Sequence, residues 1–316
     1  MWKTIAIIYF IITFVVLLVI GYVIYWILAN KKAIQYAYYN KLGCDEHNGC
    51  SANILTFKES PDFQTPYSNM MSYFLCNLIN IVYKDKVKGN IPTNLTSIET
   101  LNNGTESIPF GVILQESKTK NLYIIFRGTI NTKEWMQDFN MDQTSVTNLK
   151  FKPENNDKQV QYSLSPELAN VKIHSGFMEI YNSFKDKIVK TIQKTKPSNI
   201  IIAGHSLGAA IATIAGVDLN SKGYKPVTYA FASPRVGNET FKKIVSDNKI
   251  ILYRIVNDSD IIPTLPPSVV PNLEEPTNPF FYEHCGQEIT FTDNRFSYMN
   301  NHIISCYMDQ MAKKLK

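Results

Sequence analysis

The hydrophobic pattern of the chain is clearest where an apolar run leads into a segment of small residues. Residues 199–203 have the length and β-branching of a buried strand. Residues 209–215 are small and apolar on every side, as a buried helix should be. Between them stands Gly-His-Ser-Leu-Gly at 204–208, and a strand, this motif and a helix in sequence predict a nucleophile elbow. Such an elbow would present Ser206 Oγ above the sheet and leave the N–H of Leu207 facing an oxyanion. The competing interpretation is a Gly-Ser turn ahead of a core helix.

Further along the chain, predicted strands alternate with predicted helices. Residues 69–83 carry apolar side chains near a 3.6-residue period, which predicts an amphipathic helix, and residues 90–107 are polar enough to predict a loop. The remaining predictions are strands at 110–115, 122–126, 171–174, 227–232 and 250–256, and helices at 177–194, 239–245 and 303–314. This order predicts a doubly wound α/β fold with a mainly parallel sheet and no second domain within it.

Two features follow the predicted strand at 122–126. Thr129 stands where an α/β-hydrolase places its second oxyanion donor, although a simple strand-ending turn is the alternative. Trp135, Met136 and Phe139 lie on one side of a potential short helix, which is either a lid over a site or a small core helix. The polar stretch 142–169 predicts an insertion or a long loop.

The first 32 residues contain a long uncharged segment. Residues 5–29 lack any charge, and at 1.5 Å per residue this segment is roughly 37 Å long, enough to span a bilayer core of about 30 Å. We expect a single-pass membrane anchor, with a cleaved signal peptide as its rival, because the apolar region of a signal peptide is usually only about 7–15 residues long. The expected organisation is an anchor at 1–32, a linker or cap at 33–72 and one catalytic domain at 73–316. The charges flanking the segment do not determine which membrane face carries the domain.

Composition narrows the classes of function. A hydrophobic content of 45% supports a sizeable core. The net charge is +5, and lysines at both ends of the uncharged segment supply three of those charges, so the remainder argues against a nucleic-acid surface. There is no Cys-x-x-Cys, no His-x-x-x-His and no glycine-rich phosphate loop, so we expect no metal and no cofactor. Cys44 and Cys50 could form a disulfide, and Asn94 and Asn103 stand in glycosylation sequons that could equally have arisen by chance.

A serine nucleophile needs a base and an acid, which in this fold class follow it in the order acid, then histidine. Asp258 and Asp260 both follow the predicted strand 250–256, and the apolar residues after Asp260 could bury that carboxylate. His302 precedes the last helix and is favoured as the base, with His284 as its competitor. We expect the side chain of His205 to point away from the nucleophile, and we expect His174 to be a structural hydrogen-bonding group.

Seven motifs in one order, together with His302, give the chain a resemblance to the class 3 lipase family, the fungal triacylglycerol-lipase-like branch of the α/β-hydrolases. The resemblance runs from about residue 73 to residue 307. The motifs are Phe126-Arg127-Gly128-Thr129, Trp135-x-x-Asp138, His174-x-Gly176-Phe177, Gly204-His205-Ser206-Leu207-Gly208-Ala209-Ala210, Pro234-Arg235-Val236-Gly237-Asn238, Asp260-Ile261-Ile262-Pro263-x-Leu265-Pro266-Pro267 and Tyr282-x-His284-x-Gly286-x-Glu288.

The resemblance implies an α/β-hydrolase fold and assigns roles to the candidates. It implies Ser206, Asp260 and His302 as the catalytic triad, Thr129 and Leu207 as oxyanion donors, and a lid segment containing Trp135. His284 then falls on a structural position. The implied function is hydrolysis of carboxylic ester bonds in triacylglycerol, diacylglycerol or phospholipid, without a cofactor. The N-terminal span is a departure from the family, and the expected anchor would keep the domain against a bilayer. An esterase for small soluble esters and a catalytically silent, membrane-tethered binding module stay open as alternatives, and the oligomeric state is not determined.

Overall fold

The computed structural model describes residues 12–13, 15–22, 25, 44–45, 49–50, 57–63, 66–84, 87–102, 109–129, 141–146 and 170–315. The chain divides into two compact units, Met1–Ile54 and Leu55–Lys316. The second unit contains the predicted α/β domain and begins upstream of residue 73, because Phe57 packs its ring against Tyr73 and Phe74. Part of the expected linker therefore belongs to the domain core.

A seven-stranded sheet forms the centre of this unit, in the order β13-β10-β9-β8-β5-β4-β3. Strands β5, β8, β9, β10 and β13 run parallel to one another, and β4 and β3 extend the sheet beyond β5 with antiparallel pairing. The strands are β3 (Leu95–Leu101), β4 (Gly111–Glu116), β5 (Leu122–Phe126), β8 (Ile200–His205), β9 (Val227–Phe231), β10 (Ile251–Asn257) and β13 (Gln287–Phe291). The predicted mainly parallel α/β fold is confirmed.

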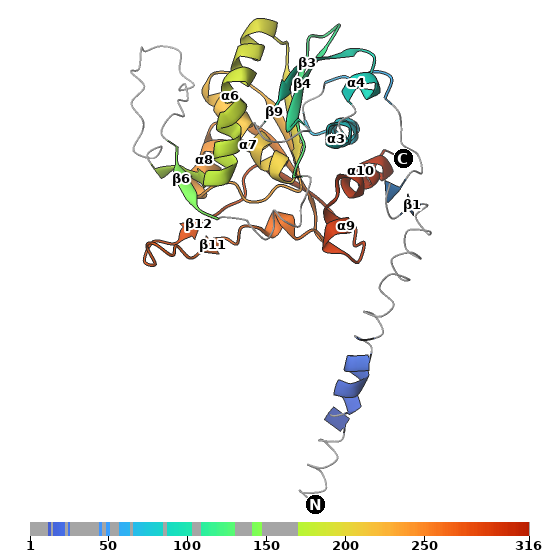
Figure 1. The fold of residues 1–316 in the computed structure, drawn as a ribbon, viewed down its shortest axis with the longest axis vertical. Coiled ribbons are helices and arrows are strands. Elements are labelled where there is room, and N and C mark those ends of the chain that lie inside the picture. The colour runs from blue at the N-terminus through green and yellow to red at the C-terminus, as the bar shows by residue number, and fades with distance from the viewer. Residues whose placement is uncertain are drawn as a thin grey trace, which may run out of the picture. The chain divides into compact units, whose positions relative to one another are not determined.

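Helices cover both faces of the sheet (Figure 1). Side chains of α6 (Ser175–Thr195), α7 (Leu207–Ser221) and α8 (Glu239–Asp247) share one buried cluster with one face. Side chains of α3 (Asn69–Tyr83) and α10 (Ile304–Lys313) share a second cluster with the other face. Successive side chains of a strand point to opposite faces of the sheet, so Ile124 of β5 lies in the first cluster and Ile125 in the second. A strand that is buried on both faces shows a continuous apolar run instead of alternating polarity.

Shorter elements complete the unit: α4 (Val87–Asn90), β6 (Gln143–Ser145), β7 (Lys172–His174), η2 (Ile262–Thr264), β11 (Val269–Val270), β12 (Phe280–Phe281) and α9 (Tyr298–His302). The expectation of a loop over 90–107 is wrong where β3 stands. This strand is polar because it is a sheet edge, where the side chains between the buried Leu95 and Leu101 are exposed or half-buried, so its composition resembles that of a loop. Strand β13 at the opposite edge was not predicted, and its side chains are likewise mostly exposed.

In the first unit, β1 (Cys44–Asp45) pairs antiparallel with β2 (Gly49–Cys50), which sets the Cα atoms of Cys44 and Cys50 opposite each other. The side chains of these two cysteines lie outside the description, so their disulfide stays a prediction. Among the described residues, no helix has the length and apolar character needed to cross a bilayer. The structure therefore does not support the expected transmembrane anchor, whose predicted span at 5–29 falls mostly outside the described residues.

The amide of Asn94 bears on the glycosylation hypothesis. Its Nδ2 donates hydrogen bonds to Ser60 Oγ at 2.8 Å and to Glu116 Oε1 at 3.1 Å, and its Oδ1 accepts from Ser60 N at 3.1 Å. Attachment of a glycan would replace one hydrogen on this nitrogen and cost one of these bonds, and the glycosylation of Asn94 stays a prediction. Asn103 lies outside the described residues.

Candidate active site

The turn between β8 and α7 is as sharp as the sequence predicts. Ser206 has φ 58° and ψ −128°, a left-handed backbone conformation that residues other than glycine rarely adopt. Glycines on either side make the turn possible. A Cβ on Gly204 would lie 2.1 Å from Gly208 O, and a Cβ on Gly208 would lie 2.3 Å from Arg127 O. The turn places Ser206 at the end of β8 and at the N-cap of α7, as in a nucleophile elbow.

Three side chains from distant parts of the chain meet at this turn. Ser206 Oγ lies 2.8 Å from His302 Nε2, and His302 Nδ1 lies 2.8 Å from Asp260 Oδ2. All three residues are buried, with exposed fractions of 2% for Ser206 and 3% each for His302 and Asp260. The geometry suits proton transfer from the hydroxyl to the imidazole, with the carboxylate fixing the tautomer of the ring. The structure thus brings together the three residues that the sequence favours.

The carboxylate of Asp260 is held by two further donors. Ile262 N donates to Oδ1 at 2.9 Å, and the hydroxyl of Tyr307 donates to Oδ2 at 2.7 Å. Burial, followed by the negative charge of Asp260, raises the pKa of Tyr307 well above its ordinary value, so this hydroxyl stays protonated and can donate. A buried carboxylate is stabilised only when its oxygens are hydrogen-bonded, and these donors meet that need.

His302 reaches the serine because the residue before it is anchored. Asn301 accepts a hydrogen bond from Arg295 N through Oδ1 at 2.6 Å and donates through Nδ2 to Ser259 O at 2.8 Å. Its own carbonyl accepts from Asn257 Nδ2 at 3.0 Å. These bonds hold the short helix α9, which ends at His302, against the end of β10.

The oxyanion candidates lie beside the nucleophile. Leu207 is the first residue of α7, so its N–H has no acceptor within the helix. Gly128 adjoins the elbow closely, because a Cβ there would lie 2.9 Å from Ser206 Cβ. The hydroxyl of Thr129, the next residue, is buried and has no hydrogen-bond partner among the described residues. A buried, unpartnered polar group is costly unless a ligand engages it, which fits a donor for developing negative charge.

The other aspartate and histidines that were considered for the triad make hydrogen bonds elsewhere in the fold. Asp258 accepts a hydrogen bond from Thr292 Oγ1 at 2.9 Å and lies outside the triad. His174 caps α6 by accepting from Phe177 N at 3.4 Å, and His284 donates to Pro263 O at 2.7 Å. His205 points away from Ser206 Oγ, as predicted, and bonds to Tyr83 and to the backbone of His302. Trp135, Met136 and Phe139 lie outside the described residues, so their role as a lid stays a prediction.

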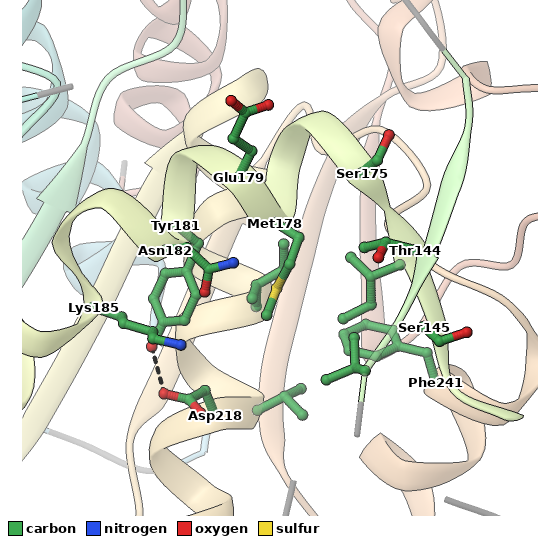
Figure 2. A pocket seen from close by; sticks show the side chains of 14 residues that line it. Thr144, Ser145, Ser175, Met178, Glu179, Tyr181, Asn182, Lys185, Asp218 and Phe241 are labelled. Atoms are coloured by element: carbon green, nitrogen blue, oxygen red, sulfur yellow. Dashed lines mark hydrogen bonds between the residues drawn. The ribbon is translucent and has the colours of Figure 1, made fainter. Parts of the chain in front are cut away.

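A cavity of about 400 Å³ lies apart from this site, between β6, α6, α7 and α8 (Figure 2). Its wall includes Met178, Phe241 and the hydrogen-bonded pair Tyr181 and Asp218, whose Oη and Oδ2 atoms are 2.6 Å apart. None of the triad residues lines it.

Within the described residues, no group of three or more histidine, cysteine or acidic side chains could hold a metal ion.

Sequence reasoning missed two residues of the site. Tyr307 lies in the last helix and Tyr83 at the end of α3, and both appear in the sequence as members of apolar helix faces. Nothing in a helical period distinguishes a tyrosine that packs from one whose hydroxyl reaches a polar partner. Only the packing of these helices on the sheet brings Tyr83 to His205 and Tyr307 to Asp260.

A nucleophile elbow after a parallel strand, an acid after a later strand and a histidine before the last helix define an α/β-hydrolase. A sequence model of the class 3 lipase family matches residues 123–270, a stretch that contains the elbow and Asp260. The comparisons therefore support the class 3 lipase family for this part of the chain.

Curated relatives agree with this placement. The chain is 28% identical over 189 residues to secreted mono- and diacylglycerol lipase 1 of Fusarium solani, covering 58% of this chain and 48% of that protein. It is 30% identical over 192 residues to a lipase of Rhizomucor miehei, covering 58% and 45%. It is 31% identical over 169 residues to the chloroplastic phospholipase A(1) DAD1 of Arabidopsis thaliana, covering 49% and 36%. The chain spans about half the length, or less, of these relatives.

The fold has solved counterparts. The structure of Rhizomucor miehei triacylglyceride lipase superposes with a TM-score of 0.55 at 24% identity, covering 72% of this chain and 80% of that one. Lipase II from Rhizopus niveus gives a TM-score of 0.55 at 21% identity, covering 72% and 82%. At this identity the likeness concerns the fold, and it supports the α/β-hydrolase architecture described above.

Proposed function

We propose that this protein is a serine hydrolase that cleaves carboxylic ester bonds of lipids. The observation that carries the proposal is the continuous hydrogen-bonded series from Ser206 Oγ through His302 to Asp260, with Ser206 held in a left-handed conformation at the elbow. The names of the relatives, a mono- and diacylglycerol lipase and a phospholipase A(1) among them, support lipid esters as the substrate class.

The geometry suggests the order of the chemical steps. Ser206 Oγ bonds to the ester carbonyl carbon as its proton passes to His302 Nε2, and the negative charge of the tetrahedral intermediate faces the N–H groups of Leu207 and Thr129. Collapse of the intermediate expels the alcohol, which takes the proton from His302 and leaves an acyl group on Ser206. Water then gives a proton to His302 as it attacks the acyl carbon, and the fatty acid leaves as the proton returns to Ser206. Asp260 holds the imidazole and stabilises its charged form.

Labelling with a fluorophosphonate tests the proposal directly. Wild-type protein should be labelled on Ser206, and a Ser206→Ala protein of equal thermal stability should not be labelled. Equal labelling of the two proteins, or hydrolysis of a lipid ester by Ser206→Ala at the wild-type rate, would falsify the assignment. If neither folded protein is labelled even with detergent micelles, the catalytically silent binding module becomes the better hypothesis.

Membrane attachment is a separate proposal that rests on the sequence alone. The uncharged segment 5–29 would hold the domain at a bilayer that contains its substrate. After expression of the full chain, alkaline carbonate should leave the protein in the membrane pellet at its full mass. Release into the supernatant, or secretion of a form shortened by about 30 residues, would show instead that the segment is a cleaved signal peptide.

A further inference from the structure

His205 occupies the centre of the site without facing the nucleophile. It precedes Ser206 in the chain, and its ring centroid lies 4.7 Å from that of His302, 5.8 Å from that of Tyr83 and 5.7 Å from that of Tyr307. Burial, followed by the proximity of His302, lowers the pKa of His205 well below its ordinary value. The ring is therefore neutral and carries one N–H, so one of its nitrogens donates and the other accepts.

A series of hydrogen bonds runs from the backbone of His302 through His205 and Tyr83 to the backbone of Gly128. The carbonyl oxygen at one end can only accept, and this fixes the direction of every bond in the series. His205 Nε2 lies 2.7 Å from the carbonyl oxygen of His302, which can only accept, so Nε2 carries the hydrogen. His205 Nδ1 must then accept, and it lies 2.8 Å from the hydroxyl of Tyr83, which donates to it. The oxygen of Tyr83 in turn accepts from Gly128 N at 2.7 Å. Burial raises the pKa of Tyr83, so its hydroxyl keeps the proton that this arrangement requires.

The series joins the two halves of the proposed catalytic apparatus. One end is the N–H of Gly128, the residue before the oxyanion candidate Thr129. The other end is the backbone of His302, whose ring contacts Ser206 and Asp260. The middle member, His205, is bonded covalently to the nucleophile. Gly128 follows β5, Ser206 follows β8 and His302 ends α9, so the series links three segments that are far apart in the sequence.

We propose that Tyr83 and His205 are positioning residues for ester hydrolysis. Together they hold the loop of Gly128 and Thr129 (the oxyanion loop) and the catalytic imidazole in fixed positions relative to Ser206 Oγ. The inference rests on the function proposed above. Tyr83 holds the oxyanion side and His205 holds the backbone of the base. A misplacement of about 1 Å in such groups can cost on the order of 10²-fold in rate, which is why this bracing matters for turnover.

Removing the hydroxyl of Tyr83 is the sharpest perturbation. In Tyr83→Phe the ring stays and both hydrogen bonds are lost, so kcat for a monomeric ester should fall about tenfold or more while KM changes less than twofold. Rates are divided by the concentration of sites titrated with fluorophosphonate, so unfolded protein does not count. The matched control is Tyr181→Phe, which removes a buried hydroxyl that bonds Asp218 Oδ2 at 2.6 Å between α6 and α7, away from the triad. This control should lose thermal stability and keep kcat per titrated site.

A second pair of variants tests His205. In His205→Gln the amide nitrogen can still donate to the carbonyl of His302, whereas His205→Leu removes donor and acceptor. Glutamine should restore kcat to within a few-fold of wild type, and leucine should not. If Tyr83→Phe and His205→Leu both keep wild-type kcat per titrated site, the series only stabilises the core and the inference is wrong. If the wild-type protein cannot be titrated at all, the function proposed above fails instead, so the two failures are distinguishable.

Discussion

At the scale of single residues, the site depends on which polar groups are buried and what they meet. Asp258 and Asp260 are two residues apart, yet only Asp260 meets the imidazole, because its carboxylate turns inward under Ile262 N and Tyr307. The same contrast separates the histidines. Only His302 bonds the hydroxyl of Ser206. His205 bonds the hydroxyl of Tyr83 and a backbone carbonyl, and His284 bonds a backbone carbonyl.

Exchanging each aspartate for asparagine tests this contrast. Asp260→Asn should lower kcat by about 10⁴-fold, because a neutral amide neither stabilises the imidazolium nor holds the productive tautomer. Asp258→Asn, whose side chain contacts Thr292 instead, should stay within twofold of wild type. Steady-state rates on a monomeric ester, normalised to titrated sites, would give both values. A large loss in Asp258→Asn with an active Asp260→Asn would reverse the assignment.

His284 gives a pH-dependent prediction about stability. Burial, reinforced by the charges of Arg254 and Arg235, lowers the pKa of His284 to about 3. The ordinary value is about 6.5, so between these values the unfolded chain binds the proton and the folded chain does not. The free energy of unfolding should therefore fall as the pH drops from about 6.5 toward 3, by up to about 1.4 kcal/mol per pH unit from this group alone.

The variant His284→Gln isolates that contribution. Its amide can still donate to Pro263 O, which wild-type His284 Nε2 contacts at 2.7 Å, and it does not titrate. Thermal unfolding at pH 7 and pH 5 should show a smaller loss of Tm in the variant than in wild type. An identical loss in both proteins would mean that His284 is protonated in the folded state at pH 5.

At the scale of elements, the elbow works because a strand and a helix approach each other closely at two glycines. Gly204 faces the backbone of Gly208 and Ala209, and Gly208 faces the end of β5 at Arg127. This approach sets the height of Ser206 above the sheet. The oxyanion loop is carried by the same β5, so strand pairing between β5 and β8 fixes the nucleophile and the loop together.

Adding one methyl group to this contact should be costly. Gly204→Ala places a Cβ 2.1 Å from Gly208 O, and backbone must shift to admit it, so we expect a loss of at least about 2 kcal/mol in the free energy of unfolding. Gly176→Ala is the matched control, because its Cβ would meet only His174 at 3.4 Å in the first turn of α6, where alanine is the better helix former. Denaturant titration of both variants would test this, and equal stabilities would refute the steric account of the elbow.

At the scale of the whole catalytic unit, the site is enclosed. Ser206 and His302 are 2% and 3% exposed, so the residues packed around them leave little of either side chain open to solvent. Two cores on opposite faces of the sheet keep the triad rigid, since one contains α7 behind the nucleophile and the other contains α10 with Tyr307. If the segment with Trp135, Met136 and Phe139 forms a lid, its opening at a lipid surface would admit the ester.

This enclosure predicts a response to lipid aggregation. The hydrolysis rate should rise sharply when the ester concentration passes the critical micelle concentration. Replacing Trp135, Met136 and Phe139 with serine should lower the ratio of micellar to monomeric rate, if these apolar residues form the lid that their sequence suggests. A wild-type rate that is saturable and smooth across that concentration would favour the esterase for small soluble esters.

The sequence by itself determined the sheet interior, the helix at 69–83 and the elbow, because a strand buried on both faces must be continuously apolar and a sharp turn requires glycine. It favoured Ser206, Asp260 and His302 through the order of the motifs. It did not determine the edge strands β3 and β13, whose half-exposed positions permit loop-like composition. Nor did it determine the roles of Tyr83 and Tyr307. Their hydroxyls meet His205 and Asp260 only after α3 and α10 pack on one face of the sheet, and such a meeting depends on tertiary distances that no local pattern encodes.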